Sequence, residues 1–253
     1  MTESAREACL QGLATEWRTM TYTWRDCALY ALAVGAGGAE PQYTYERDMQ
    51  AIPTFGATPY WGTVNVTPKL PRPRSIPVLV EEILKPEQSY VNLAYEFLYH
   101  RPIPPVKGSF VYRDVLTDLF DRGDSPIPDR PADLVERDHI GAAQNLLYRL
   151  TGDTNLVHVD RAVAVSRGLD GPFVHDLCAY GYACRLAIAG LFPGQPERLR
   201  RMYAAMKTVL YPDTPVELHL WKLAPGRAAF RLCHGTTGKA ILDRGELEWD
   251  EVV

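Results

Sequence analysis

Four side chains that can transfer protons or form hydrogen bonds lie within eight residues of one another. They belong to the stretch YRLTGDTNLVHVD, residues 148–160, and are Asp153, Asn155, His158 and Asp160. Carboxylate and imidazole groups are the commonest general acids and bases in enzymes. An almost uncharged run follows from Phe173 to Phe192. A polar cluster next to a buried apolar element is typical of a catalytic pocket.

The same residue types also allow other interpretations. Asp153, His158 and Asp160 could bind a metal ion, but the chain has no HExxH motif, no Cys/His framework and no calcium-loop pattern. Asp160 is better placed as the N-cap of a short helix over residues 161–167. GxSxG, phosphate-loop and GxGxxG motifs are absent as well. General acid–base chemistry without a metal is therefore the leading interpretation.

Composition excludes several classes of protein. The chain has 253 residues, 46% hydrophobic and 23% charged, with a net charge of −4. These values are ordinary for a soluble globular protein and give no basic footprint for nucleic acid. Arg185 interrupts the longest apolar run, so a membrane span is not expected. Five scattered cysteines without a CxxC pair, together with the polar N-terminus and the absence of a C-terminal Ser-Lys-Leu, predict a reduced cytoplasmic protein.

The elements that must position the polar cluster can be outlined from residue patterns. Thr23 and Asp26 predict the start of a helix that stops at Gly35. Three- and four-residue spacing of apolar side chains predicts another helix within residues 1–20. Residues 177–192 are long and apolar enough for a buried helix of about four turns. Several small residues on it would let neighbouring backbone approach closely.

Strands are predicted on both sides of a linker. Residues 90–99 and 108–119 alternate as strands, whereas residues 124–139 are rich in Pro, Asp and Ser and predict the linker. Four further strands are predicted, at residues 202–210, 215–223, 228–233 and 239–249. A buried helix followed by an antiparallel meander predicts an α+β fold in which a sheet wraps around the helix.

Residues 148–160, with Ala164 downstream, resemble the hydratase 2 motif of the MaoC-like, (R)-specific enoyl-CoA hydratases. The resemblance continues through GLDGPFVHDLCAYG, LYPDTP and the closing strands up to Glu248, and the N-terminal half matches through YTWRDCALYALAVGA and HRPIPP. It implies a double hot-dog fold with a degenerate N-terminal half at residues 1–123 and a catalytic half at residues 140–253.

The resemblance also implies a function. Asp153 and His158 would activate water for the hydration of a 2-enoyl thioester, or for the reverse dehydration. The backbone N–H of Asp176 would stabilise the thioester oxygen, with Asn155 and Gly152 in support. Tyr180 and Gly181 are candidates for substrate binding, although Tyr180 also reads as a core residue, and His175 is expected to be structural. No metal or cofactor is expected, the substrate being a thioester of coenzyme A or of a carrier protein, and the protein is expected to be a homodimer.

Three departures from the family pattern leave alternatives open. Asp176 replaces a glycine, Leu156 replaces a proline, and the N-terminal half is short. A carboxylate about 4 Å from an enolate oxygen would oppose its negative charge by several kcal/mol. A dehydratase, isomerase or cyclase acting on a polyketide-like substrate is therefore an alternative, and a non-catalytic acyl-binding subunit is another.

Overall fold

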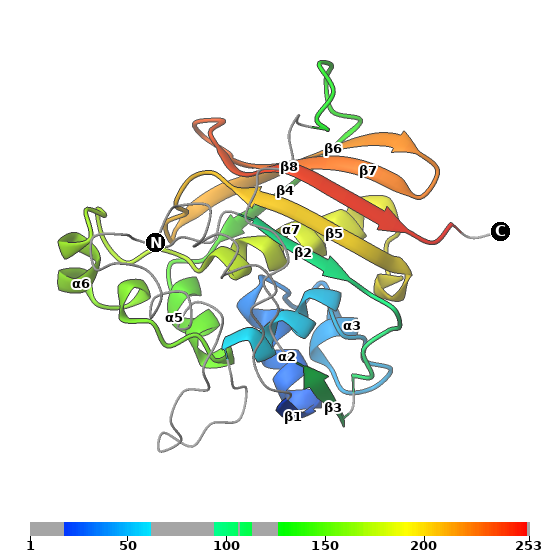
Figure 1. Ribbon diagram of the computed structural model, residues 1–253, viewed down its shortest axis with the longest axis horizontal. Helices are drawn as coiled ribbons and strands as arrows, with labels where there is room; N and C mark the ends of the chain where they lie inside the picture. Colours follow the sequence, from blue (N-terminus) through cyan, green and yellow to red (C-terminus); the bar gives the residue numbers. More distant parts are fainter. Residues whose placement is uncertain (1–17, 62–93, 106, 113–125, 252–253) are drawn as a thin grey trace, which may run out of the picture.

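A computed structural model of the chain describes residues 18–61, 94–105, 107–112 and 126–251 (Figure 1). The N-terminal half contains β1 (Arg18–Thr23), α2 (Trp24–Ala33), α3 (Pro41–Thr44), η1 (Pro53–Trp61), β2 (Ala94–Leu98) and β3 (Lys107–Tyr112). The C-terminal half contains β4 (Leu134–Ile140), α5 (Gln144–Tyr148), η2 (Arg149–Thr151), η3 (Leu156–His158), α6 (Arg161–Ser166), α7 (Asp176–Leu191), η4 (Pro196–Arg198), β5 (Leu199–Met206), β6 (Thr214–Ala224), β7 (Arg227–His234) and β8 (Ala240–Trp249). None of the described helices is long and apolar enough to cross a membrane.

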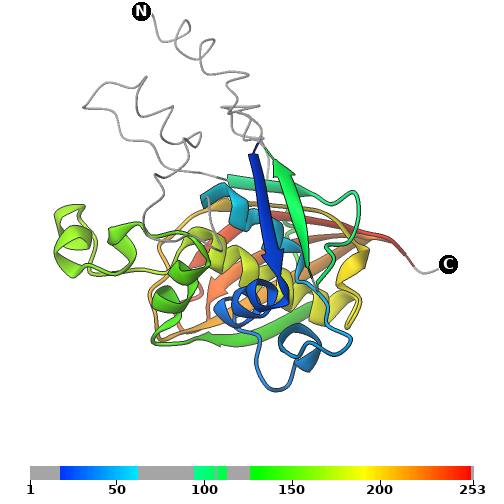
Figure 2. The ribbon, with the colours of Figure 1, turned by 90° about the horizontal axis from the view of Figure 1, so that it is seen from below.

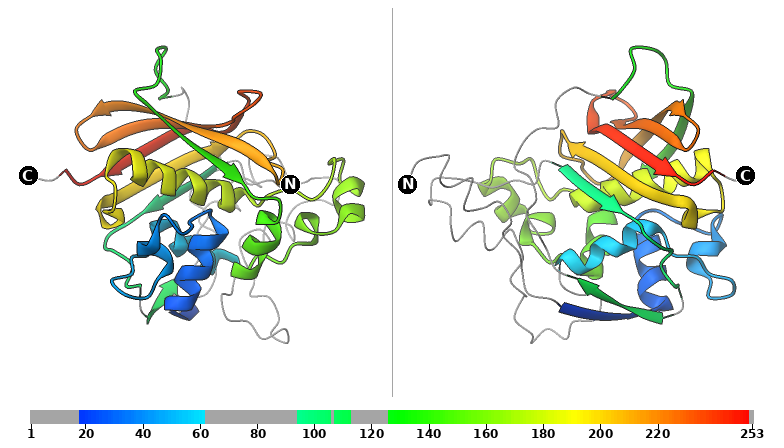
Figure 3. Two further views of the ribbon diagram at one scale, coloured as in Figure 1. Left: turned by 180° about the vertical axis from the view of Figure 1, so that it is seen from behind. Right: turned by 45° about the vertical axis from the view of Figure 1, so that its right-hand side comes forward.

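An antiparallel six-stranded sheet, in the order β2-β5-β8-β7-β6-β4, curves over the helix α7 (Figures 1 and 3). Along β6, Val216, Leu218 and Leu220 are buried at alternating positions, as a strand with one face on a core requires. α7 contacts four strands of this sheet and is buried over most of its length. The predicted α+β arrangement of a sheet wrapped around a central helix is therefore confirmed.

The helix α2 packs against the other side of α7. It begins with a capping box in which the Asp26 carboxylate accepts hydrogen bonds from the backbone N–H (2.6 Å) and hydroxyl (2.9 Å) of Thr23. A side chain at Gly181 of α7 would overlap Val34, so this glycine permits the close approach of the two helices. β1 and β3 pair beside α2, on the side remote from the six-stranded sheet (Figure 2).

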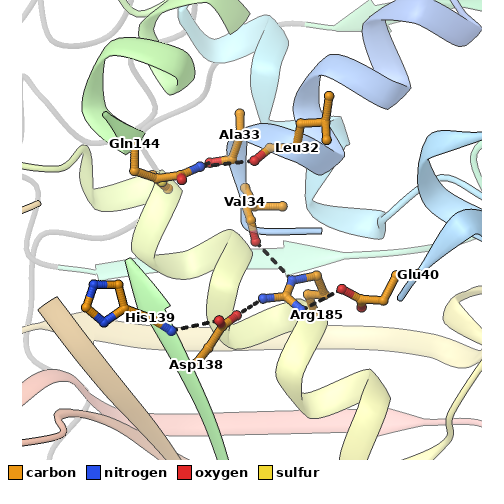
Figure 4. Close-up of polar contacts among 9 residues, drawn as sticks. Leu32, Ala33, Val34, Glu40, Asp138, His139, Gln144 and Arg185 are labelled. Carbon is orange, nitrogen blue, oxygen red and sulfur yellow. Dashed lines mark hydrogen bonds and ion pairs between the residues drawn. The ribbon is translucent and has the colours of Figure 1, made fainter. Parts of the chain in front are cut away.

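Buried polar contacts join the two halves where α2 ends (Figure 4). Arg185 of α7 donates to the Val34 carbonyl (3.0 Å) and to Glu40 (2.8 Å), and it also pairs with Asp138 of β4. Gln144 donates to the carbonyls of Leu32 (3.1 Å) and Ala33 (2.5 Å). The last carbonyls of an α-helix have no partner within the helix. These contacts satisfy them and hold the N-terminal half against α7.

Several boundaries differ from the sequence predictions. The strand predicted at residues 202–210 is β5, which spans Leu199–Met206. Residues 134–139 of the predicted linker form, together with Ile140, the edge strand β4, which pairs with β6. Its charged segment from Glu136 to His139 is typical of an edge strand, and that composition concealed it. Residues 18–20, predicted as the end of a helix, belong to β1, while residues 1–17 lie outside the described residues. Parts of the strands predicted at residues 90–99 and 108–119 also lie outside them.

Candidate active site

The polar stretch forms an irregular loop between α5 and α6 that local hydrogen bonds hold in place. Gly152 turns the chain with φ +136°, a conformation that residues with side chains rarely adopt. The Asp153 carboxylate accepts from the backbone N–H of Asn155 (3.0 Å). Asn145 of α5 donates to the His158 carbonyl (2.7 Å). The loop therefore presents Asp153 and His158 in fixed positions.

Asp153 and His158 are brought together in a buried site, being 3% and 6% exposed. His158 Nε2 lies 4.0 Å from Asp153 Oδ2. His158 Nδ1 lies 2.9 Å from the Phe173 carbonyl. Because a carbonyl can only accept, Nδ1 carries the proton, and the lone pair of the neutral ring is on Nε2, facing the carboxylate. Burial lowers the pKa of His158 in spite of the nearby Asp153, which favours this neutral form.

A second histidine packs directly on the first. The His175 ring stacks on His158 with centroids 3.7 Å apart and 25° between the planes, and its Nε2 lies 3.2 Å from the Asp153 carbonyl. His175 is 1% exposed, and burial together with His158 lowers its pKa to about 3. The sequence analysis expected it to be structural. The loop before α7 is what brings it to the site.

Asp176 is the first residue of α7. The first N–H groups of an α-helix lack carbonyl partners within the helix, so this end can offer donors to an anionic oxygen. The Asp176 residue is half-buried, and burial followed by the charge of Asp153 raises its pKa to about 6. A carboxyl with that pKa is protonated in about half of the molecules at pH 6 but in only about one in ten at pH 7, so the repulsion it would exert on a developing anion weakens as the pH falls toward 6.

The other predicted residues have different surroundings. The Asn155 side chain accepts from the Val157 N–H (3.3 Å) and so begins η3. Asp160 caps α6 by accepting from the Ala162 N–H (2.8 Å), as the sequence indicated. Tyr180 packs against Phe97, and both Tyr180 and Gly181 are buried in the core of α7. Leu156, in the position where the family has proline, is 55% exposed.

The geometry does not suit a metal ion bound by Asp153, His158 and His175 together. Asp153, His158 and His175 have potential ligand atoms within 4.8 Å of one another. A metal lies in the plane of each imidazole that binds it, at about 2 Å from the nitrogen. Two rings 3.7 Å apart and inclined by 25° have planes that meet only about 8 Å away. One ion therefore cannot take both histidines in this arrangement.

Each half of the chain matches the model of a known domain family. Residues 124–243 match the MaoC like domain, and residues 20–127 match the MFE-2 hydratase 2 N-terminal domain. The chain is 29% identical to 3-hydroxyacyl-thioester dehydratase Y of Mycobacterium tuberculosis over 94% of this chain and 96% of that protein. It is 25% identical to a probable enoyl-CoA hydratase 2 of Dictyostelium discoideum, covering 88% and 89% of the two chains. A MaoC-like dehydratase from Phytophthora capsici has the same fold, with a TM-score of 0.81 at 20% identity over the full length of both chains.

Proposed function

Since the two halves of this chain match the MaoC like domain and the MFE-2 hydratase 2 N-terminal domain, we propose that it is a hydro-lyase that adds water to a 2-enoyl thioester or removes it from a 3-hydroxyacyl thioester. The observation that carries the proposal is the facing pair of His158 Nε2 and Asp153 Oδ2, 4.0 Å apart in a buried site. A water oxygen about 2.8 Å from each atom fits this gap. Two acceptors then hold one water in a defined orientation.

Hydration proceeds by addition across the C2–C3 double bond. The water oxygen bonds to C3 as His158 Nε2 takes one of its protons, and the displaced electron pair moves toward the thioester oxygen. The N–H of Asp176 at the start of α7 stabilises that oxygen, and the helix dipole adds to the effect. The Asp153–His158 pair then returns a proton to C2. The pair ends in its starting protonation state, so the proposed reaction needs no metal and no redox cofactor.

The test is hydration of crotonyl-CoA and of longer enoyl-CoA esters by the purified protein, followed through the loss of enoyl absorbance. We expect turnover by the wild type and at least a hundredfold lower kcat for Asp153→Ala. Asp160→Ala is a matched control, because that carboxylate caps α6 instead of facing His158. Absence of turnover by the wild type with every ester would refute the proposal.

A second reaction class is favoured by Asp176. A carboxyl whose pKa burial raises to about 6, next to Asp153, could act as a further acid or base in elimination or enolisation of a polyketide-like substrate. Asp176→Gly distinguishes the two reactions, because it retains the backbone N–H and removes the carboxyl. Unchanged or faster enoyl-CoA hydration by this variant favours the simple hydratase.

Retention of the Asp153–His158 pair argues against a non-catalytic acyl-binding subunit.

We also propose that the protein is a homodimer. The family resemblance supports this, because a homodimer is what that resemblance implies. Light scattering after gel filtration gives the mass directly, and a monomer at assay concentration would refute this part of the proposal. Activity that appears only in a mixture with a second hot-dog chain would instead favour the non-catalytic acyl-binding subunit.

A further inference from the structure

The side chain of His175 contacts both members of the proposed catalytic pair. Its Nε2 lies 3.2 Å from the Asp153 carbonyl, and its ring stacks on His158 at 3.7 Å. The Phe173 ring also lies near His158, with the ring centroids 4.4 Å apart and the planes inclined by 59°. His158 therefore has two aromatic neighbours, and one of them, His175, is also hydrogen-bonded to the residue that carries the catalytic carboxylate.

Helix capping does not account for this side chain. His175 is the N-cap of α7, but its backbone carbonyl accepts the N–H groups of Cys178 (3.0 Å) and Ala179 (3.2 Å), and its side chain forms no cap hydrogen bond. Any residue type can supply that carbonyl. The imidazole is instead directed back to the loop of Asp153, 22 residues earlier in the chain.

The hydrogen bond fixes the tautomer of His175. Because the Asp153 carbonyl accepts, Nε2 carries the proton. Nδ1 is then an acceptor, buried and without a hydrogen-bond partner among the described residues. The charged groups that act on the two rings are Asp153 and Arg167 for His158, and Arg149 for His175. His175 therefore stays neutral while its neighbour exchanges a proton, and it covers one face of that neighbour without competing for the proton.

We propose that His175 is a positioning residue of the hydration site: it anchors Asp153 through its backbone carbonyl and holds His158 by ring stacking, so that Oδ2 and Nε2 face one water. This inference rests on the proposed function for its kinetic meaning, but the geometry it asserts can be tested without turnover. The two contacts use different parts of the imidazole and can be removed separately.

Two variants separate the contacts. His175→Gln retains an N–H donor within reach of the Asp153 carbonyl but has no ring, and His175→Phe retains the ring but has no donor. We expect kcat for crotonyl-CoA to fall 10- to 100-fold in both, with KM within threefold of the wild type. NMR titration measures the pKa of His158 in each variant. Loss of the covering ring admits water, so this pKa should rise in His175→Gln and stay within about 0.3 pH units of the wild type in His175→Phe.

A purely structural role would lower the melting temperature without this pattern. Folded variants whose kcat lies within twofold of the wild type would overturn the proposal. So would equal NMR titration of His158 in both variants.

Nitrogen NMR of the wild type keeps the proposal testable if neither variant folds. At pH 7 we expect the proton on Nδ1 of His158 and on Nε2 of His175, and the opposite tautomer of either ring would overturn the inference. The outcomes also separate it from the proposed function. An inactive wild type with the expected tautomers refutes hydration alone, whereas an active wild type with fully active variants refutes the positioning role alone.

Discussion

Replacing Asp176 by asparagine is expected to stabilise the protein at pH 8 but not at pH 4. Burial and the nearby Asp153 raise the pKa of Asp176 from an ordinary value of 3.8 to about 6. A carboxyl with a raised pKa contributes stability that is present below its unfolded value and lost as pH rises through its folded value. Above pH 6 the folded wild type therefore carries an unfavourable charge that asparagine lacks.

The magnitude follows from the size of the shift. About two pKa units correspond to about 3 kcal/mol at about 1.4 kcal/mol per unit. Asparagine also gives up the favourable interaction of an anion with the first turn of α7, worth about 0.5–1 kcal/mol. The partial exposure of Asp176 to solvent reduces the first figure further. The expected net gain is about 2 kcal/mol at pH 8, falling to zero or slightly below at pH 4.

Urea unfolding at pH 4, 6 and 8 measures this directly. With a denaturant slope of about 3 kcal/mol per molar, the midpoint of Asp176→Asn should rise by about 0.7 M at pH 8. Asp170→Asn, an exposed position in the same loop region, is the matched control and should change stability by less than about 0.5 kcal/mol at each pH. A constant difference between Asp176→Asn and the wild type from pH 4 to 8 would refute the assignment of Asp176 as a destabilised, buried carboxyl.

Two further substitutions test the contacts that hold the halves together. Arg185→Ala leaves Glu40 and Asp138 without their cationic partner and should lower the free energy of unfolding by about 3 kcal/mol, measured by chemical denaturation; a loss below 1 kcal/mol would mean that these pairs are not coupled to folding. Gly181→Ala places a methyl group against Val34 and should lower the free energy of unfolding by about 1–3 kcal/mol, seen as a lower melting temperature. Gly194→Ala is the control: open space surrounds this position, so its stability should fall only by the backbone strain of an alanine at φ +73°.

Local sequence signals predicted the elements whose causes are local. The Thr23–Asp26 capping box involves only neighbouring residues and marks the start of α2. Asp160 marks the start of α6 in the same way. The alternation along β6 predicted burial of one face of the strand, and the apolar run of α7 predicted burial on most sides of the helix. The Asp153–His158 spacing located the polar groups, and the family resemblance supplied their proposed roles.

Features that depend on distant contacts were missed. β4 is stabilised by pairing with β6, 80 residues away between Arg137 and Glu217, and its alternating charges do not distinguish it from a linker. His175 acquires its contact with Asp153 only through the folded loop before α7. The core character of Tyr180 was indicated by the sequence, but its contact with Phe97 of β2 and the contact of Gly181 with Val34 at the end of α2 were not. Periodicity along the chain carries no information about these partners.

The central claim is that Asp153 and His158 act on one water, and a double-mutant cycle tests it most directly. The rates of crotonyl-CoA hydration by Asp153→Asn, His158→Gln and the double variant are compared with that of the wild type. Groups that act as a unit are strongly non-additive. We predict that each single variant loses at least a hundredfold in kcat and that the double variant loses little more than the worse of the two. Losses that multiply in the double variant, or a single variant with wild-type kcat, would contradict the account.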